Sequence, residues 1–256
     1  MAFAQGSRSS LSYVVESTFG TTPSGNFITL PFTSHSLNLT KDIMEGNDIQ
    51  ADRMPRVNRQ GNRQTSGDIA VDLRRGDFDV LLESAMLSTW ATNVLKVGTT
   101  PKFFSIEDYA ADIDQARLFT GMTVSTLGIS MAPNQMVATT FGMIGKDMTI
   151  SQTQKTLTAS GTYAPFDAYS GSIGIGAIGT GTPSSVAIVT GIDFTLENSY
   201  APTFVIGSDS APSLEFGRAE VSGTISAYFQ DAALINRFLN ETETGVQVIV
   251  NDPSGS

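Results

Sequence analysis

The sequence predicts a mainly β fold, a sandwich or barrel with a short flanking α-helix, in which one unit is partly duplicated. The chain has 256 residues, of which 40% are apolar and 16% charged, so it can bury a sizeable core. It contains 24 glycines and many threonines and serines, which favour strands and turns over long helices. Short alternating segments recur along it, and one segment occurs twice.

The repeated segment is "SGDIAVDLRRGDFDVLLESAM" at 66–86 and "SGTISAYFQDAALINRFLNE" at 222–241. Each copy begins Ser-Gly, continues with strand-like alternation and turns into a short amphipathic helix. An offset of 156 residues places Gly67 on Gly223 and Leu82 on Phe238. Upstream, "GIDFTLENS" resembles "SHSLNLTKD" in the same way. The residues expected in the buried helix stripes are Phe78, Leu81 and Leu82 in the first copy and Leu234 and Phe238 in the second.

The chain divides into four predicted parts. They are an extended arm over 1–26, a first β-domain over 27–150, a connection rich in Gly, Ser and Thr over 151–190, and a second, related but shorter β unit over 191–256. The first domain contains a polar segment at 41–65 that predicts a long loop. Only about 15 residues follow the second helix. Either the chain lacks a tail or the second unit borrows strands from elsewhere, and the sequence leaves both open.

No residue pattern predicts catalysis, a metal site or a cofactor. The chain has no cysteine and a single histidine, His35, for which no partner is marked, so we expect a structural role for it. The "GIGAIG" run lacks the helix that a dinucleotide site requires, and the acidic "EDYAADID" run lacks the turn glycine of a calcium loop. No apolar run approaches 18 residues, so we expect no insertion into a membrane.

Four arginines lie in the predicted 41–65 loop: Arg53, Arg56, Arg59 and Arg63. One interpretation is a solvated surface loop, and the other is an interaction element for nucleic acid or for an acidic protein surface. The net charge of −10 favours an acidic protein partner, which other copies of this chain supply. We therefore predict self-association through this loop.

Three stretches carry a resemblance to a known family: "ESTFGTTP", the first repeat copy, and "FTGMTVSTLGISM" with "ATTFGMIGKDM". Over most of residues 11–240 the chain resembles the tail tube (major tail) proteins of long-tailed, siphovirus-type bacteriophages. The resemblance implies a β-sandwich or barrel of the tail-tube type, made in the cytoplasm of the bacterial host and located in the phage tail of the virion. It implies stacked rings that conduct DNA during ejection, without binding it specifically. Tape-measure, tail-tip and neck proteins are the further partners that it implies.

The duplication bears on how such a ring would close. If each chain supplies two tube units, three chains form a ring with pseudo-sixfold symmetry; if the second copy is an appended domain, six chains are needed. We favour the trimer, because both copies keep the strand and helix signals at one offset.

Two other functions remain open. A carbohydrate- or receptor-binding β-sandwich module usually presents exposed aromatic residues, but the only tryptophan, Trp90, follows a helix where core packing is expected. An enzyme on a β scaffold is disfavoured by the lone histidine, the lack of cysteine and the absence of a paired-acid motif.

Overall fold

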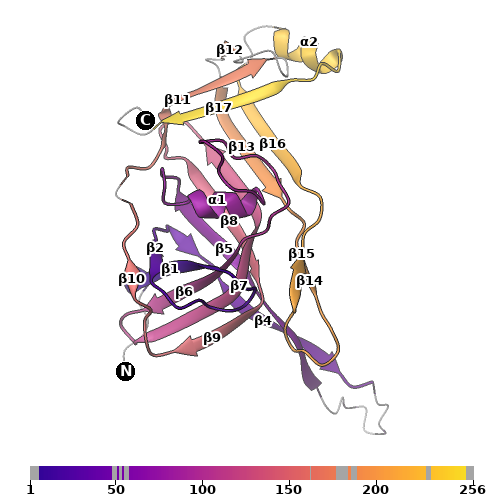
Figure 1. Cartoon of the computed structure of the whole chain (residues 1–256). Helices are drawn as coiled ribbons and strands as arrows, with labels where there is room; N and C mark the ends of the chain where they lie inside the picture. Colours follow the sequence, from indigo (N-terminus) through magenta and orange to yellow (C-terminus); the bar gives the residue numbers. More distant parts are fainter. Residues whose placement is uncertain are drawn as a thin grey trace.

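The computed structural model describes residues 6–47, 51, 54, 58–161, 163–176, 184–185, 189–228 and 232–251. Within them the fold is mainly β, as the sequence predicts. It comprises a large sheet of twelve strands, a three-stranded sheet and a two-stranded sheet. Two short α-helices complete it, α1 (Asp79–Ala85) beside the large sheet and α2 (Ala233–Leu239) at one end of the molecule (Figure 1).

The longest strand, β7 (Gln115–Met131), is the spine of the large sheet. Along one edge it pairs first with β6 (Phe103–Ala110) and then with β13 (Val189–Glu197). Along the other edge it pairs with β9 (Asp147–Ser151) and then with β8 (Ala138–Gly145). A register shift midway along the β7–β8 ladder marks a bulge, which bends a strand locally. One strand therefore joins two halves of the sheet that can curve around a core.

The half of the sheet next to β6 contains β1 (Ser9–Glu16), β2 (Phe27–Leu30) and β10 (Leu157–Thr158), in that order, and a 3-10 turn, η1 (Gly6–Arg8), precedes β1. The predicted extended arm over 1–26 is therefore wrong for residues 9–16. Strand β1 pairs on both sides and buries Leu11 and Tyr13. The sequence could not show this, because β6 lies far along the chain and the apolar alternation of β1 is short.

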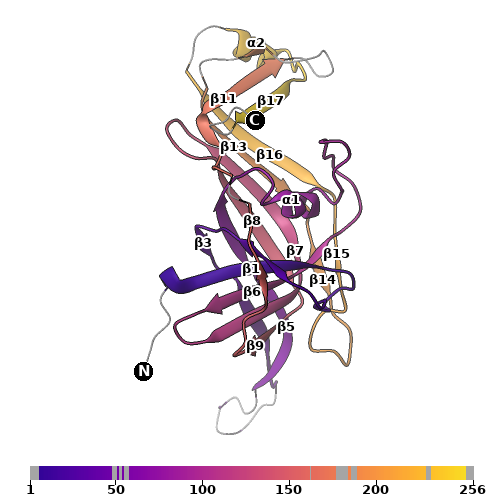
Figure 2. The ribbon, with the colours of Figure 1, turned by 60° about the vertical axis from the view of Figure 1, so that its left-hand side comes forward.

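On the far side of β8 lie β5 (Asn58–Asp72) and, paired with it, β3 (Ser34–His35) and β4 (Asn38–Glu45). The predicted long loop over 41–65 is thus wrong at both ends, because 41–45 and 58–65 are strands of a hairpin. Most side chains there are polar, and those of 41–45 and 58–60 are solvent-exposed, so no apolar alternation marked the strands. The hairpin projects from the body at one end of the molecule (Figures 1 and 2).

Strand β13 continues the sheet to β16 (Glu220–Ala227). Between them, β14 (Ala201–Thr203) and β15 (Ser213–Glu215) form a small hairpin that extends toward the same end as β4 and β5 (Figure 1). Every pairing in the series β4, β5, β8, β7, β13 and β16 is antiparallel.

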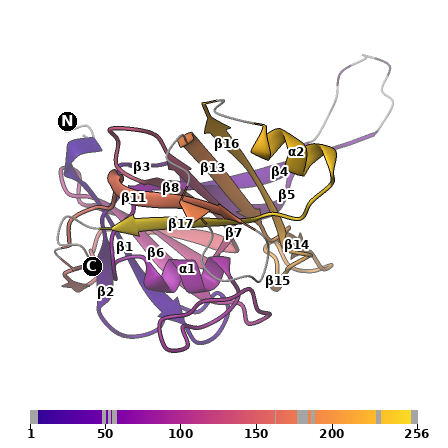
Figure 3. The same ribbon diagram turned by 90° about the horizontal axis from the view of Figure 1, so that it is seen from above.

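A three-stranded sheet lies at the opposite end of the molecule, beside α2 (Figures 1 and 3). It consists of β11 (Asp167–Gly176), β12 (Ser184–Ser185) and β17 (Gly245–Asn251). The predicted connection over 151–190 is therefore partly a strand. Its glycines and serines disfavour a strand intrinsically, and the pairing with β17, which lies about 75 residues on, overrides that preference.

The main core lies between the halves of the sheet and under α1. Phe78 and Leu81 are fully buried there, and Leu82 packs against the core while half-buried. The other large, fully buried side chains of this core are Leu11, Leu30, Ile69, Phe104, Ile106, Phe119, Met122, Phe141 and Leu196. Strands β1, β5, β6, β7, β8 and β13 all contribute to it.

The two sequence copies form hairpins with the same register. The five pairs from Ser34–Ala70 to Thr40–Gln64 in the first hairpin, which are interrupted at residues 36–37, each have a counterpart among the seven pairs from Gly191–Ser226 to Glu197–Glu220 in the second. Each hairpin is followed by a helix, α1 or α2. The second hairpin does not start a separate sheet but extends the first through the β7–β13 ladder.

Candidate functional site

One face of the large sheet carries negative charge and no positive charge in three rows that cross five strands. Side chains directly opposite each other on paired strands lie on the same face. Read from β5 through β8, β7 and β13 to β16, the rows are Asp72, Ala138, Ser130, Asp193 and Thr224; Ala70, Thr140, Gly128, Thr195 and Ser222; and Asp68, Gly142, Thr126, Glu197 and Glu220. We call these fifteen residues the acidic face. Five are acidic and none is Lys or Arg. On β5, β8, β7 and β13 the residues that alternate with them point to the core, whereas on β16 Val221 and Ile225 are exposed.

Local contacts order two parts of the acidic face. The Ser130 hydroxyl donates to the Asp193 carboxylate at 2.6 Å. A Cβ added to Gly142 would lie 2.1 Å from Thr126 Oγ1 and 3.3 Å from Asp68 Oδ1, so the two neighbouring side chains lean over this glycine. The result is a sheet surface of small hydroxyl and carboxylate groups whose field has one sign, which repels polyanions.

Arg63 lies in strand β5 and is engaged within the chain. Its Nη2 lies 2.9 Å from Asp147 Oδ2 and 3.2 Å from Asp209 Oδ2, and its backbone N–H donates to the Asp209 carbonyl at 2.8 Å. A parallel bridge joins Arg63 to Ser210 in the β14–β15 hairpin. Arg63 therefore ties the base of the first hairpin to the loop that interrupts the second, which the sequence did not reveal because Asp209 lies far along the chain.

The other predicted contact arginines are distributed differently. Arg59 is exposed on β5, opposite Met44 of β4, so it is available to a partner. Arg53 and Arg56 lie outside the described residues. Near the same tip, Ile43 is 69% exposed and Met44 is 55% exposed, so the projecting hairpin presents apolar as well as basic side chains.

A comparison with protein families decides what kind of protein carries this acidic face. The model of the phage tail tube protein family matches residues 6–256. The chain belongs to this family. It is a structural tail tube protein, and a component of the phage virion.

Three solved chains show partial similarity to this one. The tail tube protein is similar to a chain of the anti-feeding prophage baseplate, with a TM-score of 0.46, 9% identity, and 59% of this chain and 97% of that chain covered. It is also similar to the cap that terminates the anti-feeding prophage tube, with a TM-score of 0.39, 15% identity and coverage of 59% and 92%. The sheath/tube terminator of an extracellular contractile injection system gives a TM-score of 0.39, 11% identity and coverage of 59% and 98%. No curated protein matches the sequence.

The burial of the apolar helix residues differs between the two repeats of the tail tube protein. Phe78 and Leu81 lie in the core, whereas Phe238 is 83% exposed, so its predicted burial is wrong. Leu234 lies in α2, and its side chain is outside what the structure describes. The amphipathic pattern was read correctly as a helix, but it does not specify whether the apolar side meets the chain's own core or solvent.

His35 and Asp108 belong to an ionic group that joins four strands of the tail tube protein. His35 Nε2 lies 3.6 Å from Asp108 Oδ1, the Ser9 hydroxyl donates to the same oxygen at 2.8 Å, and Arg117 Nε donates to Oδ2 at 3.0 Å. Burial alone would raise the pKa of Asp108, but these neighbours outweigh it and lower the pKa to about 2. The group joins β1, β3, β6 and β7, which is a structural role.

Other candidate chemistry finds little support in the part of the chain that the structure describes. No three His, Asp or Glu side chains gather there in a way that could hold a metal ion. Among the same residues no helix is both long and apolar enough to cross a membrane. Trp90 is 40% exposed rather than in the core, and its indole N–H donates to the Asp79 carbonyl of α1 at 3.3 Å.

Proposed function

We propose that this tail tube protein assembles with copies of itself into rings, that the rings stack into the phage tail tube, and that the acidic face lines its channel. The observation that carries the proposal is that face: five carboxylates and no cation over fifteen residues on five adjacent strands. The protein acts without chemistry. Its assembly takes place in the cytoplasm of the bacterial host, and its further partners are the tape-measure, tail-tip and neck proteins.

An acidic wall suits a DNA conduit for a physical reason. Proteins that hold DNA neutralise phosphates with Lys and Arg and displace condensed counterions. A wall with only carboxylates and hydroxyls offers no such neutralisation, so DNA in the channel stays hydrated and slides. On β5, β8, β7 and β13 the opposite face packs against the core, including Ile69 and Phe141, so that part of it is not available to line a channel.

The sheet also supplies surfaces for closing a ring. Among the described residues, β16 pairs only with β13, and β3 and β4 pair only with β5, so each end of the strand series has a free edge. Such edges tend to pair with another chain. We propose that the β16 edge of one copy pairs with the β3–β4 edge of the next. Three copies with pseudo-sixfold symmetry are favoured over six, because the two hairpins of each chain have the same register.

The experiment combines electron microscopy with DNA binding. Negative-stain images of the purified protein at several concentrations should show rings or tubes, with three strong lobes for the trimer and six equal lobes for the hexamer. The double variant Thr140→Lys/Thr195→Lys adds two cations per chain to the acidic face, and Thr140→Gln/Thr195→Gln is its neutral control.

Tubes of the wild type and of the Gln control should not retain short duplex DNA on sedimentation. Tubes of the Lys variant should retain it at low salt and release it at high salt. Absence of any ring at every concentration would contradict the assembly. Tubes whose DNA retention is the same in all three proteins would place the acidic face elsewhere than the channel.

A further inference from the structure

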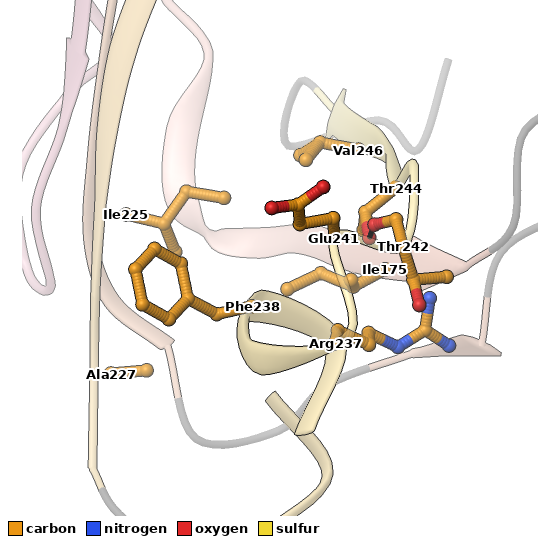
Figure 4. A pocket seen from close by; sticks show the side chains of 9 residues that line it. All are labelled: Ile175, Ile225, Ala227, Arg237, Phe238, Glu241, Thr242, Thr244 and Val246. Carbon is orange, nitrogen blue, oxygen red and sulfur yellow. Dashed lines mark hydrogen bonds between the residues drawn. The ribbon is translucent and has the colours of Figure 1, made fainter. Parts of the chain in front are cut away.

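The space between the helix and the hairpin is open in the second repeat, whereas in the first repeat it is filled by the core. Between α2 and β16 lies an apolar groove of about 490 Å³, lined by Ile225, Phe238 and Val246 among others. Figure 4 shows the side chains of Phe238, on α2, and Ile225, on β16, pointing toward each other. This groove lies on the core side of the sheet, opposite the acidic face.

Residues at matching positions of the repeats have very different exposure. Ile69 in β5 is 0% exposed, while its counterpart Ile225 in β16 is 36% exposed. Leu82 of α1 packs against the core, while its counterpart Phe238 of α2 is 83% exposed. The same sequence pattern therefore forms a packed interface in the first repeat and lines an open groove in the second.

The difference is explained by what covers each helix. In the first repeat, Ile69 and Leu81 share one core with Ile106 of β6 and with Phe119 and Met122 of β7. After α2, the only strand within the residues that the structure describes is β17. The second repeat thus has its hairpin and its helix but no cover equivalent to β6 and to this part of β7.

A second apolar groove, of about 610 Å³, joins this site to the main core. Its walls include Met131 and Val137 from the end of the core, Phe194 of β13, and Val246 and Val248 of β17. The core therefore continues past the first repeat and reaches solvent under β16 and α2. An apolar surface of this kind on a single copy is typical of a surface that is covered in an assembly.

We propose that a second copy of this chain, the ring neighbour whose edge pairs with β16, inserts apolar side chains into the groove between α2 and β16. The inference rests on the proposed ring and adds to it the surface by which copies interlock. The occupant is a copy of this chain because the groove runs along β16, which pairs only with β13 among the described residues and whose other edge is the one that the proposed ring uses. In the first repeat, the equivalent helix and hairpin pack against strands of this same chain, which also favours a copy of the chain as the occupant. Each contact then combines strand pairing with burial of apolar groups.

Single cysteines test the proposal, because the natural chain has none. Phe238→Cys lies in the groove, and Asn236→Cys lies on the same helix outside the groove lining and is also exposed. Both should react quickly with a maleimide in dilute, unassembled protein. In sedimented assemblies, Phe238→Cys should react at least tenfold more slowly, while Asn236→Cys should keep its rate. Equal rates for Phe238→Cys in both states would overturn the proposal while leaving the ring itself intact.

A second pair of variants separates docking from assembly in general. Ile225→Asp puts a charge into the groove, and Thr224→Asp puts the same charge next to it on the acidic face. Circular dichroism of both should match the wild type, because Ile225 is already partly exposed. Ile225→Asp should raise the concentration needed for assembly at least tenfold, and Thr224→Asp should change it less than threefold. Equal effects of the two charges would overturn the proposal, and failure of the wild type to assemble would overturn the ring and the docking together.

Discussion

Gly67 and Gly223 lie at the same point of two hairpins, each against the backbone of the facing strand. A Cβ added to Gly67 would come within 2.6 Å of the Ser36 carbonyl oxygen, and one added to Gly223 within 2.7 Å of the Asp193 carbonyl oxygen. The Ser-Gly that begins each sequence copy is therefore a place where the two sides of each hairpin approach closely.

This close approach predicts that Gly67→Ala destabilises the fold more than Gly223→Ala. Gly67 also has a φ of +148°, which side chains rarely adopt, so the change should lower the free energy of unfolding by about 2–4 kcal/mol. Gly223 is exposed on β16 and has no such φ, so we expect about 1–2 kcal/mol. Urea denaturation measures both. Gly128→Ala is the control, because nothing lies closer than 3.9 Å to its Cβ position, and a loss there as large as at Gly67 would contradict the explanation.

The buried carboxylate of Glu16 predicts a large loss of stability when it is removed. It accepts hydrogen bonds from Gly20 N at 2.6 Å, from Ser105 Oγ at 2.6 Å and from Gly121 N at 2.9 Å. Glu16→Ala leaves these donors without their acceptor and should cost about 3 kcal/mol. Glu16→Gln keeps one acceptor oxygen and should cost less. Thermal denaturation ranks the three proteins, and a Gln variant less stable than the Ala variant would show that charge or shape, not unsatisfied donors, governs the site.

The lowered pKa of Asp108 predicts acid sensitivity in a defined range. Because the folded pKa is about 2 and the ordinary value is 3.8, the ionised carboxylate stabilises the fold fully at pH values above about 4. That contribution, about 2 kcal/mol, is lost as the pH falls from 4 toward 2. Urea denaturation from pH 5 to pH 2 should show a steeper loss for the wild type than for Asp108→Asn. Parallel curves would mean that other carboxylates account for the loss.

Arg59 and Arg63 should differ in what their substitution disturbs. Arg63→Ala removes the ion pairs to Asp147 and Asp209, so chymotrypsin should cut the 201–215 segment, which contains Phe204 and Leu214, faster while the overall stability changes by less than about 1 kcal/mol. Arg59→Glu leaves those ion pairs in place and should impair tube formation with unchanged proteolysis. Normal tubes from Arg59→Glu would contradict a contact through this side chain.

The fold class and the repeat could be predicted from sequence, because alternation and the Ser-Gly start are local signals. Strand β1, the polar hairpin around Arg59 and strand β11 could not, because their strand character comes from partners that are distant in sequence. The acidic face has a partial signal in the spacing of Asp68 and Asp72. Its other rows depend on the register of β8, β7, β13 and β16, which no local pattern specifies.

Phe238 shows that apolar periodicity in a helix does not by itself predict burial within the chain. Its helix has the expected pattern, yet the side chain is exposed in the single chain. An amphipathic pattern predicts that the apolar side of a helix is covered, but it does not predict which molecule covers it.

The strictly antiparallel order of six strand positions, from β3 and β4 to β16, has a consequence for the tube as an object. Because the number of positions is even, the two outer strands run in opposite directions, and a neighbour with the same orientation can join antiparallel without being turned over. All copies in a ring then point the same way, and the two rims of the ring differ. A stack of the proposed rings would be a directional filament, so the growing tail would have two unlike ends that can bind different partners.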